Sequence, residues 1–130
     1  MKKEIWRHSW LESIHKLTSF KLQNNIIVNL ANGASSWSFD ILMNHYIDKV
    51  LLGFDYQYYT DKMNYLSPEE YEIIQDWHNE LEDYILLIGD ESDETVILRD
   101  KLLISFLENG KLVKQKLLAV LPEAEKRYLK

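Results

Sequence analysis

The segment from Ser67 to Ile88 constrains the fold more than any other part of the sequence, because its start, faces and end all indicate one helix. Ser67-Pro68-Glu69-Glu70 combines an N-cap serine, a proline at the first helical position and a glutamate three residues after the cap, which is a capping box. Apolar residues then recur at helical spacing: Ile73, Ile74, Trp77, Leu81, Tyr84, Ile85 and Ile88. Gly89 is placed to end the helix.

Helical spacing recurs before this segment. Trp6, Trp10, Ile14 and Leu17 fall at steps of four and three, which predicts a helix from about Lys3 to Phe20. A second apolar stripe from Phe39 to Leu51 predicts a helix capped by Ser35 or Ser36 and ended by Gly53. Residues 26–30 fit either a short strand or the end of a helix. Phe54–Leu66 has no helical or strand period, so we expect this segment to be an ordered connection with a surface role.

The C-terminal third also shows helix signals. Asp93 is a candidate cap for a helix that reaches about Glu108, and Asn109-Gly110 is a typical helix end. Shorter helices are predicted from about Leu112 to Leu121 and after Pro122. With only four Gly and two Pro among 130 residues, the sequence predicts an all-α fold, a single-domain bundle of five or six helices with short connections.

The charge is segregated along the chain. Met63 to Leu98 is a run of 36 residues without Lys or Arg that carries eleven acidic residues, and the whole chain has a net charge of −6. The other 94 residues therefore sum to +5, from 15 basic and 10 acidic residues. Cys is absent, and no apolar run approaches the ~18–20 residues that span a bilayer. We expect a soluble cytoplasmic protein with no membrane segment.

Five of these acids share one side of the helix from Ser67 to Ile88, at steps of three and four: Glu69, Glu72, Asp76, Glu80 and Asp83. Neighbouring like charges at this spacing cost a few tenths of a kcal/mol each, so the row indicates a use. A basic protein partner is the first interpretation, since a one-sign field attracts the opposite sign. Two alternatives stay open: the basic residues between Arg99 and Lys130 cover the row, or the row has no role.

An aromatic cluster precedes this helix. Tyr56, Tyr58 and Tyr59 are predicted as partner-binding anchors, with Asp61 beside them, because tyrosine supplies contact area at low entropic cost and is enriched in interfaces. The alternative interpretation is that about half of these tyrosines only pack against the core. A stacking platform for nucleic acid is disfavoured, since Lys62 is the only cation among them.

Enzyme motifs are incomplete. His8, Glu12 and His15 have a spacing that could hold a divalent metal, and His78 has carboxylates nearby, which leaves a metal-dependent or acid–base enzyme as an alternative. The sequence has no Walker loop, HExxH or Gly-x-Ser-x-Gly motif. We therefore predict no catalytic residues, no metal and no cofactor. A second alternative is an adaptor or antitoxin with weak DNA contact through Arg99–Lys130, which holds eight basic and four acidic residues.

Two segments carry a resemblance to a known family. Gly33–Phe39 leads into Asn44–Asp48, and Leu66–Tyr71 leads into Ile74–Asn79. Together, over about residues 30–90, they resemble the small helical immunity proteins of bacterial polymorphic toxin and contact-dependent growth inhibition systems. The resemblance implies a non-enzymatic inhibitor in the cytosol of the producing cell. Such a protein binds one toxin domain, often a basic nuclease, by charge complementarity.

Overall fold

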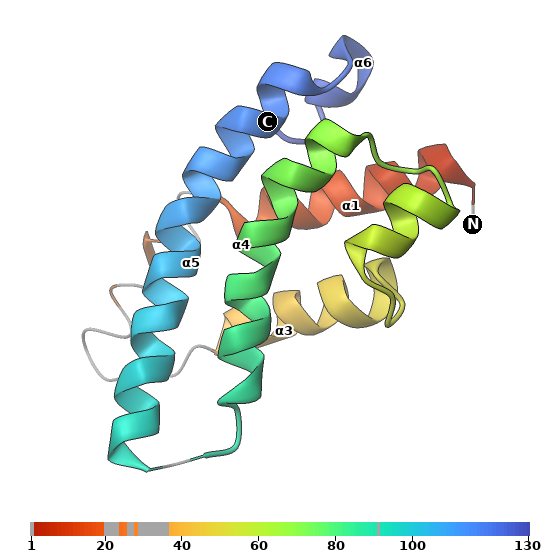
Figure 1. Ribbon diagram of the computed structural model, residues 1–130. Coiled ribbons are helices and arrows are strands. Elements are labelled where there is room, and N and C mark those ends of the chain that lie inside the picture. The colour runs from red at the N-terminus through yellow and green to blue at the C-terminus, as the bar shows by residue number, and fades with distance from the viewer. Residues whose placement is uncertain (1, 20–23, 26–27, 29–36, 91) are drawn as a thin grey trace.

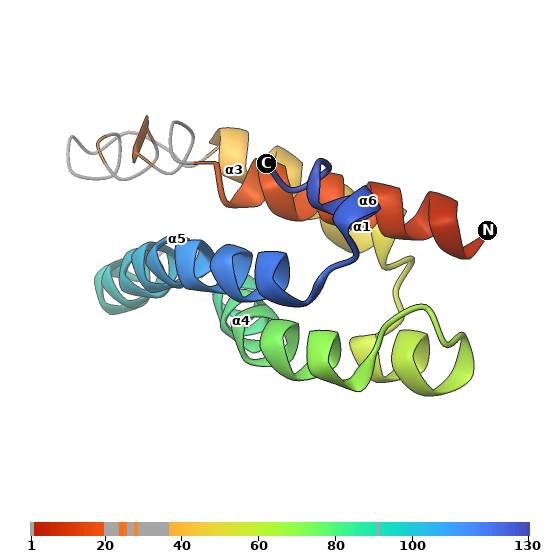
Figure 2. The same ribbon diagram turned by 90° about the horizontal axis from the view of Figure 1, so that it is seen from above.

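The computed structural model describes residues 2–19, 24–25, 28, 37–90 and 92–130. Over these residues the protein is a small all-α domain without a β-strand, as the sequence predicts. Helices α4 (Pro68–Leu86) and α5 (Asp93–Val120) lie side by side and antiparallel (Figure 1). Helices α1 (Lys3–Leu17) and α3 (Trp37–His45) form a second layer across them, as Figure 2 shows from above.

Helix α1 supplies the centre of the core. Its predicted apolar stripe is confirmed, since Trp6, Trp10, Ile14 and Leu17 are all buried. The two indole rings stack with their centroids 5.6 Å apart. The indole nitrogen of Trp6 donates to the backbone oxygen of Val50 at 2.9 Å, which ties α1 to the end of the next helical segment.

The predicted helix from Phe39 to Leu51 is present as α3 and a following π-helical turn, η1 (Tyr46–Val50). Leu52 and Gly53 then both adopt left-handed backbone conformations, with φ of 56° and 80°. The segment therefore ends before the predicted Gly53, since Leu52 already leaves the helical conformation and Gly53 follows it in the same turn. The predicted caps Ser35 and Ser36, and all of residues 26–30 except Val28, lie outside the described residues.

Helix α4 begins as its capping box predicts. The Ser67 hydroxyl accepts from the backbone nitrogen of Glu70 at 3.2 Å, and the Glu70 carboxylate accepts from the backbone nitrogen of Ser67 at 2.9 Å. The predicted apolar face packs inward, since Ile74, Trp77, Leu81 and Tyr84 are all buried. Ile88 is an exception, since it lies beyond the helix end and is 48 % exposed.

The predictions for the C-terminal third were wrong in two details. Ser92, not Asp93, caps α5, because its hydroxyl accepts from the backbone nitrogen of Thr95. Asn109-Gly110 does not end the helix, which continues to Val120. Large apolar residues on both sides of Gly110 are buried, and burying each is worth ~1.5–3 kcal/mol, whereas a helical glycine costs only ~1 kcal/mol. Packing therefore overrides the local stop signal.

The connection from Phe54 to Leu66 contains helical structure that the sequence did not predict. Its centre is a second π-helical turn, η2 (Tyr58–Lys62).

Near the C-terminus, Pro122 precedes the short helix α6 (Glu123–Lys126), which brings the C-terminus back to α1 (Figure 2). Among the helices that the structure describes, none is long and apolar enough to cross a membrane.

Candidate functional site

The acidic row on α4 is largely uncovered. Glu69, Glu72, Asp76 and Asp83 are exposed. Within the described part of the chain, none of these four carboxylates forms a hydrogen bond or ion pair. The alternative in which the basic segment Arg99–Lys130 covers the row therefore finds no support in the ion pairs of the described residues.

Glu80 differs from the rest of the row. Its carboxylate is partly buried and accepts from the Ser105 hydroxyl at 3.0 Å and from the Asn109 amide at 2.7 Å. Both donors belong to α5, so Glu80 joins the two antiparallel helices. This acid has a structural reason to be present, and the row available to a partner is reduced to the four exposed carboxylates.

A groove of about 360 Å³ runs between α4 and α5 beside this row. One wall carries Glu72, Asp76 and Glu80, and the opposite wall carries Lys116. Its apolar lining consists of Ile73, Trp77, Leu112 and Val113. The arrangement brings an apolar floor next to an acidic edge, which is the usual pairing of a buried centre with a charged rim in protein interfaces.

The groove floor is rigid. The Trp77 ring stacks on Phe106 with centroids 4.3 Å apart and planes 7° apart, and its indole nitrogen donates to the Phe106 backbone oxygen at 2.8 Å. Leu112, which lines the same groove, keeps 55 % of its surface exposed. The floor is therefore preformed and still presents apolar surface to solvent.

Two of the predicted tyrosine anchors are core residues, which corrects the sequence interpretation. Tyr56 and Tyr59 are 0 % and 3 % exposed. Tyr59 stacks on Trp6 with centroids 4.4 Å apart and donates to the Leu51 backbone oxygen at 2.6 Å. Tyr59 lies in the π-helical turn and Tyr56 in the helical residues just before it, and both rings pack against α1, so neither ring is available to a partner in this fold.

Tyr58 and Asp61 remain near the surface. The Tyr58 ring is half-buried and stacks on Phe54 with centroids 4.1 Å apart, while Asp61 is exposed. Both line a hollow of about 220 Å³ together with Asp55, Gln57 and Lys62. This hollow shares no residue with the α4–α5 groove, so the structure does not join the predicted tyrosine and acidic contacts into one site.

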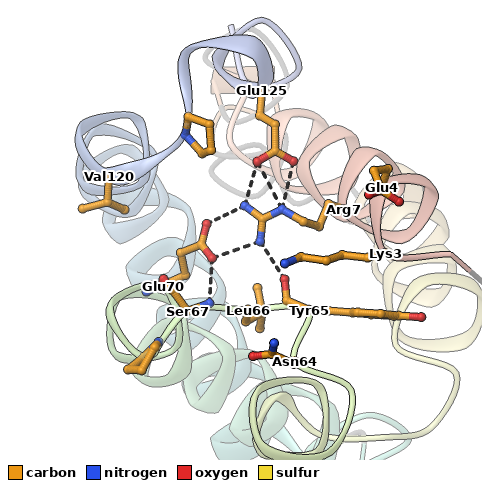
Figure 3. Close-up of a pocket in the computed structure, with 12 residues that line it drawn as sticks. Lys3, Glu4, Arg7, Asn64, Tyr65, Leu66, Ser67, Glu70, Val120 and Glu125 are labelled. Carbon is orange, nitrogen blue, oxygen red and sulfur yellow. Dashed lines mark hydrogen bonds and ion pairs between the residues drawn. The ribbon is translucent and has the colours of Figure 1, made fainter.

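A buried ion cluster joins α1, α4 and α6, and sequence reasoning missed it. All five N–H groups of Arg7 are used: they bind the carboxylates of Glu70 and Glu125 and the backbone oxygen of Tyr65 (Figure 3). The shortest contact, to Glu70, is 2.6 Å. A cavity of about 600 Å³ lies beside the cluster, but Arg7 has no donor left for a ligand there.

Electrostatics in this cluster favour the charged forms. Burial opposes the charge on Arg7, but the hydrogen bonds to Glu70 and Glu125 outweigh it and raise the pKa of Arg7. Burial likewise opposes the charge on Glu70, and hydrogen bonds from Arg7 and Ser67 outweigh it and lower the pKa of Glu70. The cluster is therefore a satisfied structural ion network.

A second polar chain crosses the core from Trp10 to Glu82. The Trp10 indole donates to the Tyr56 hydroxyl at 3.0 Å, Tyr56 and Tyr46 share a hydrogen bond, Tyr46 is 3.0 Å from Nδ1 of His78, and Nε2 of His78 is 3.0 Å from Glu82. Tryptophan only donates and a carboxylate only accepts, so with His78 neutral each group donates to the next, and the imidazole proton is assigned to Nε2. Burial lowers the pKa of His78, and Glu82 offsets part of this effect.

The predicted metal trio does not converge. Nε2 of His8 lies 3.5 Å from Glu12, whereas Nδ1 of His15 faces the Leu129 backbone oxygen and Lys114, at 3.2 and 3.4 Å. Over the described ranges, no group of three or more His, Asp and Glu side chains has the arrangement of metal ligands. Within the described residues, His8, Glu12 and His15 therefore do not form the predicted metal site.

Comparison with known proteins finds no family model, no curated protein and no solved structure that matches this chain.

Proposed function

We propose that this chain is a non-enzymatic acidic binding protein, an immunity protein that neutralises a cationic toxin domain in the bacterial cytoplasm. The observation that carries the proposal is the exposed row on α4, where Glu69, Glu72, Asp76 and Asp83 have no partner among the described residues. The similarity of residues 30–90 to immunity proteins of toxin systems supports the same class of function.

The charge of the row fits a toxin that acts on nucleic acid. Such a domain binds a phosphate backbone and must present Lys and Arg on its active surface. An exposed helix with carboxylates one turn apart offers these cations an alternative anion, and a strong opposite field speeds association. Binding to that surface inhibits the toxin without any chemistry by the immunity protein.

The test is co-expression with the product of the neighbouring reading frame. A secreted protein with a basic C-terminal domain is the expected neighbour. The proposal predicts that this chain co-purifies with that domain and restores growth to cells that express it. A control chain with Glu72 and Asp76 both changed to Lys should restore growth poorly.

Absence of both co-purification and growth rescue, at low and at physiological salt, would contradict the proposal. Rescue without a physical complex would instead indicate an enzymatic or transcriptional mechanism.

A further inference from the structure

The α4–α5 groove has two unlike walls and an apolar floor, and this combination restricts what can occupy it. The α4 wall is acidic through Glu72, Asp76 and Glu80, while Lys116 is on the α5 wall. Since Glu80 already binds Ser105 and Asn109, only Glu72 and Asp76 are available for new ion pairs at the α4 wall. These two are four positions apart on the helix and therefore lie about one turn from each other.

We infer that this groove is the docking site for a cationic segment of a partner protein. The segment inserts one apolar side chain over Trp77 and Leu112 and places Lys or Arg against Glu72 and Asp76. This inference rests on the proposed function and adds where the partner is held and which chemistry it presents.

The size of the groove sets the scale of the occupant. About 360 Å³ is near the lower end of ligand pockets, which hold one or two large side chains rather than a whole helix. Leu112 lines the groove and keeps 55 % of its surface exposed, so a partner side chain can cover it. An anchoring side chain from a partner segment fits this volume, with the rest of the segment lying across the two helices.

Charge selects the sign and direction of the segment. A cationic flank is favoured along α4 and disfavoured beside Lys116 on α5, so the basic side of the segment faces α4. A second copy of this chain is a poor occupant, since each copy has a net charge of −6 and would bring another acidic helix to the groove. Burial of the apolar anchor slows dissociation of the segment, while the two carboxylates speed its association and fix its orientation in the groove.

The probe is a library of random peptides of about 12 residues displayed on phage and selected on the full chain. Selected peptides should combine an aliphatic or aromatic residue with nearby Lys or Arg. Their affinity, measured by calorimetry, should fall about tenfold or more on the Glu72→Lys/Asp76→Lys variant and on the Leu112→Asp variant. Lys116→Glu should strengthen binding, because it removes the repulsive cation.

The matched control is Asp48→Lys/Glu108→Lys, which makes the same charge change at two exposed acids outside both the groove and the acidic row on α4. Equal weakening by both pairs would mean that net charge, not the groove, binds the peptides, and would overturn the inference. Peptides without Lys or Arg, no enrichment at all, or complete loss of binding at ~0.15 M salt would overturn it too.

The growth-rescue assay separates this inference from the proposed function. If the Leu112→Asp chain binds and neutralises the partner as well as the unchanged chain, the groove is the wrong site and the immunity function stands. If the unchanged chain fails to bind the partner, the proposed function fails whatever the peptides do.

Discussion

Glu70 and Glu72 are two positions apart on the same helix, yet their surroundings are opposite. Glu70 is 3 % exposed and binds Arg7 and Ser67, while Glu72 is exposed with no partner within the described residues. The first belongs to the Arg7 cluster that joins α1, α4 and α6. The second belongs to the groove wall that faces solvent.

The two residues represent two kinds of charge. Buried charges such as that of Glu70 hold the helices together, whereas exposed charges such as that of Glu72 form no ion pair among the described residues. A buried carboxylate is tolerated only with compensating partners, so residues far apart in sequence must converge on Glu70. Glu69 is favoured in the first turn of α4 by the helix dipole, but the exposed like charges further along the row slightly destabilise the helix that carries them. We propose binding as the role of the second set, and each variant below tests one side of this division.

The largest effect is expected from Arg7→Met. This change leaves Glu70 buried without its cation and removes the link to Glu125 in α6. Removing one partner of a buried ion network costs about 3–5 kcal/mol of unfolding free energy. Urea unfolding followed by circular dichroism measures this loss.

Lys16→Met is the matched control for Arg7→Met. Lys16 pairs with Glu12 at 3.4 Å on the exposed side of α1, where both side chains are about half exposed. Exposed pairs are worth ~0–1 kcal/mol, so this variant should unfold close to the unchanged chain. Equal losses of unfolding free energy in the two variants would show that the buried Arg7 cluster stabilises the fold no more than an exposed ion pair does.

A smaller loss of stability is expected on mild acidification, through His78. Because burial lowers its pKa in the folded state, the unfolded chain takes up a proton below about pH 6.5 that the folded chain refuses. Protonation would also reverse the hydrogen bond to Tyr46 and leave one of the hydroxyls of Tyr46 and Tyr56 without an acceptor in this chain of hydrogen bonds. The contribution of His78 to the unfolding free energy should therefore be constant above pH 6.5 and fall as the pH drops from there toward the lowered pKa.

Comparison with His78→Gln isolates this contribution, since glutamine cannot take up the proton. The decline just below pH 6.5 should be weaker in the variant, while the later loss below about pH 4.5, where Glu70 becomes protonated in the unfolded chain, should remain. Identical pH profiles for the two chains would show that His78 does not control acid stability.

Local signals in the sequence were enough to predict the elements that depend on neighbours along the chain. The capping box at Ser67 and the apolar stripe of α1 both appear as expected, because a cap and a helix face are determined within a few residues. The acidic row was also placed correctly on one side of α4. These features can be predicted without knowing which distant segments pack against each other.

The errors concern contacts between distant segments. Arg7 is 63 positions from Glu70 and 118 from Glu125, and nothing in its local sequence indicates that it is buried. Tyr56 and Tyr59 were taken for surface anchors because an aperiodic aromatic segment looks like a loop, whereas the segment is helical there, with Tyr59 in the π-helical turn and Tyr56 just before it, and both rings lie in the core. The continuation of α5 through Gly110 likewise depends on packing along α4.

A finer test lies within the acidic row itself, between Glu80 and Asp76. Glu80→Ala removes two hydrogen bonds to α5 and should lower unfolding free energy by about 1–2 kcal/mol. Asp76→Ala, one helical turn away, should change it by no more than about 0.5 kcal/mol. Chemical unfolding of both variants measures the contrast, and a cost for Asp76→Ala as large as for Glu80→Ala would mean that the whole row is structural.

The smallest effect on stability is expected where the effect on binding is largest. Replacing Glu72 with Gln and Asp76 with Asn relieves a like-charge pair, so unfolding free energy should stay the same or rise by a few tenths of a kcal/mol. Association with a basic toxin domain should slow about tenfold and depend less on salt, while dissociation changes little, because charged rims govern encounter more than lifetime. Stopped-flow kinetics at two ionic strengths measures both rates. A variant that loses stability but keeps its association rate would assign Glu72 and Asp76 to the fold and remove the binding role of the groove wall.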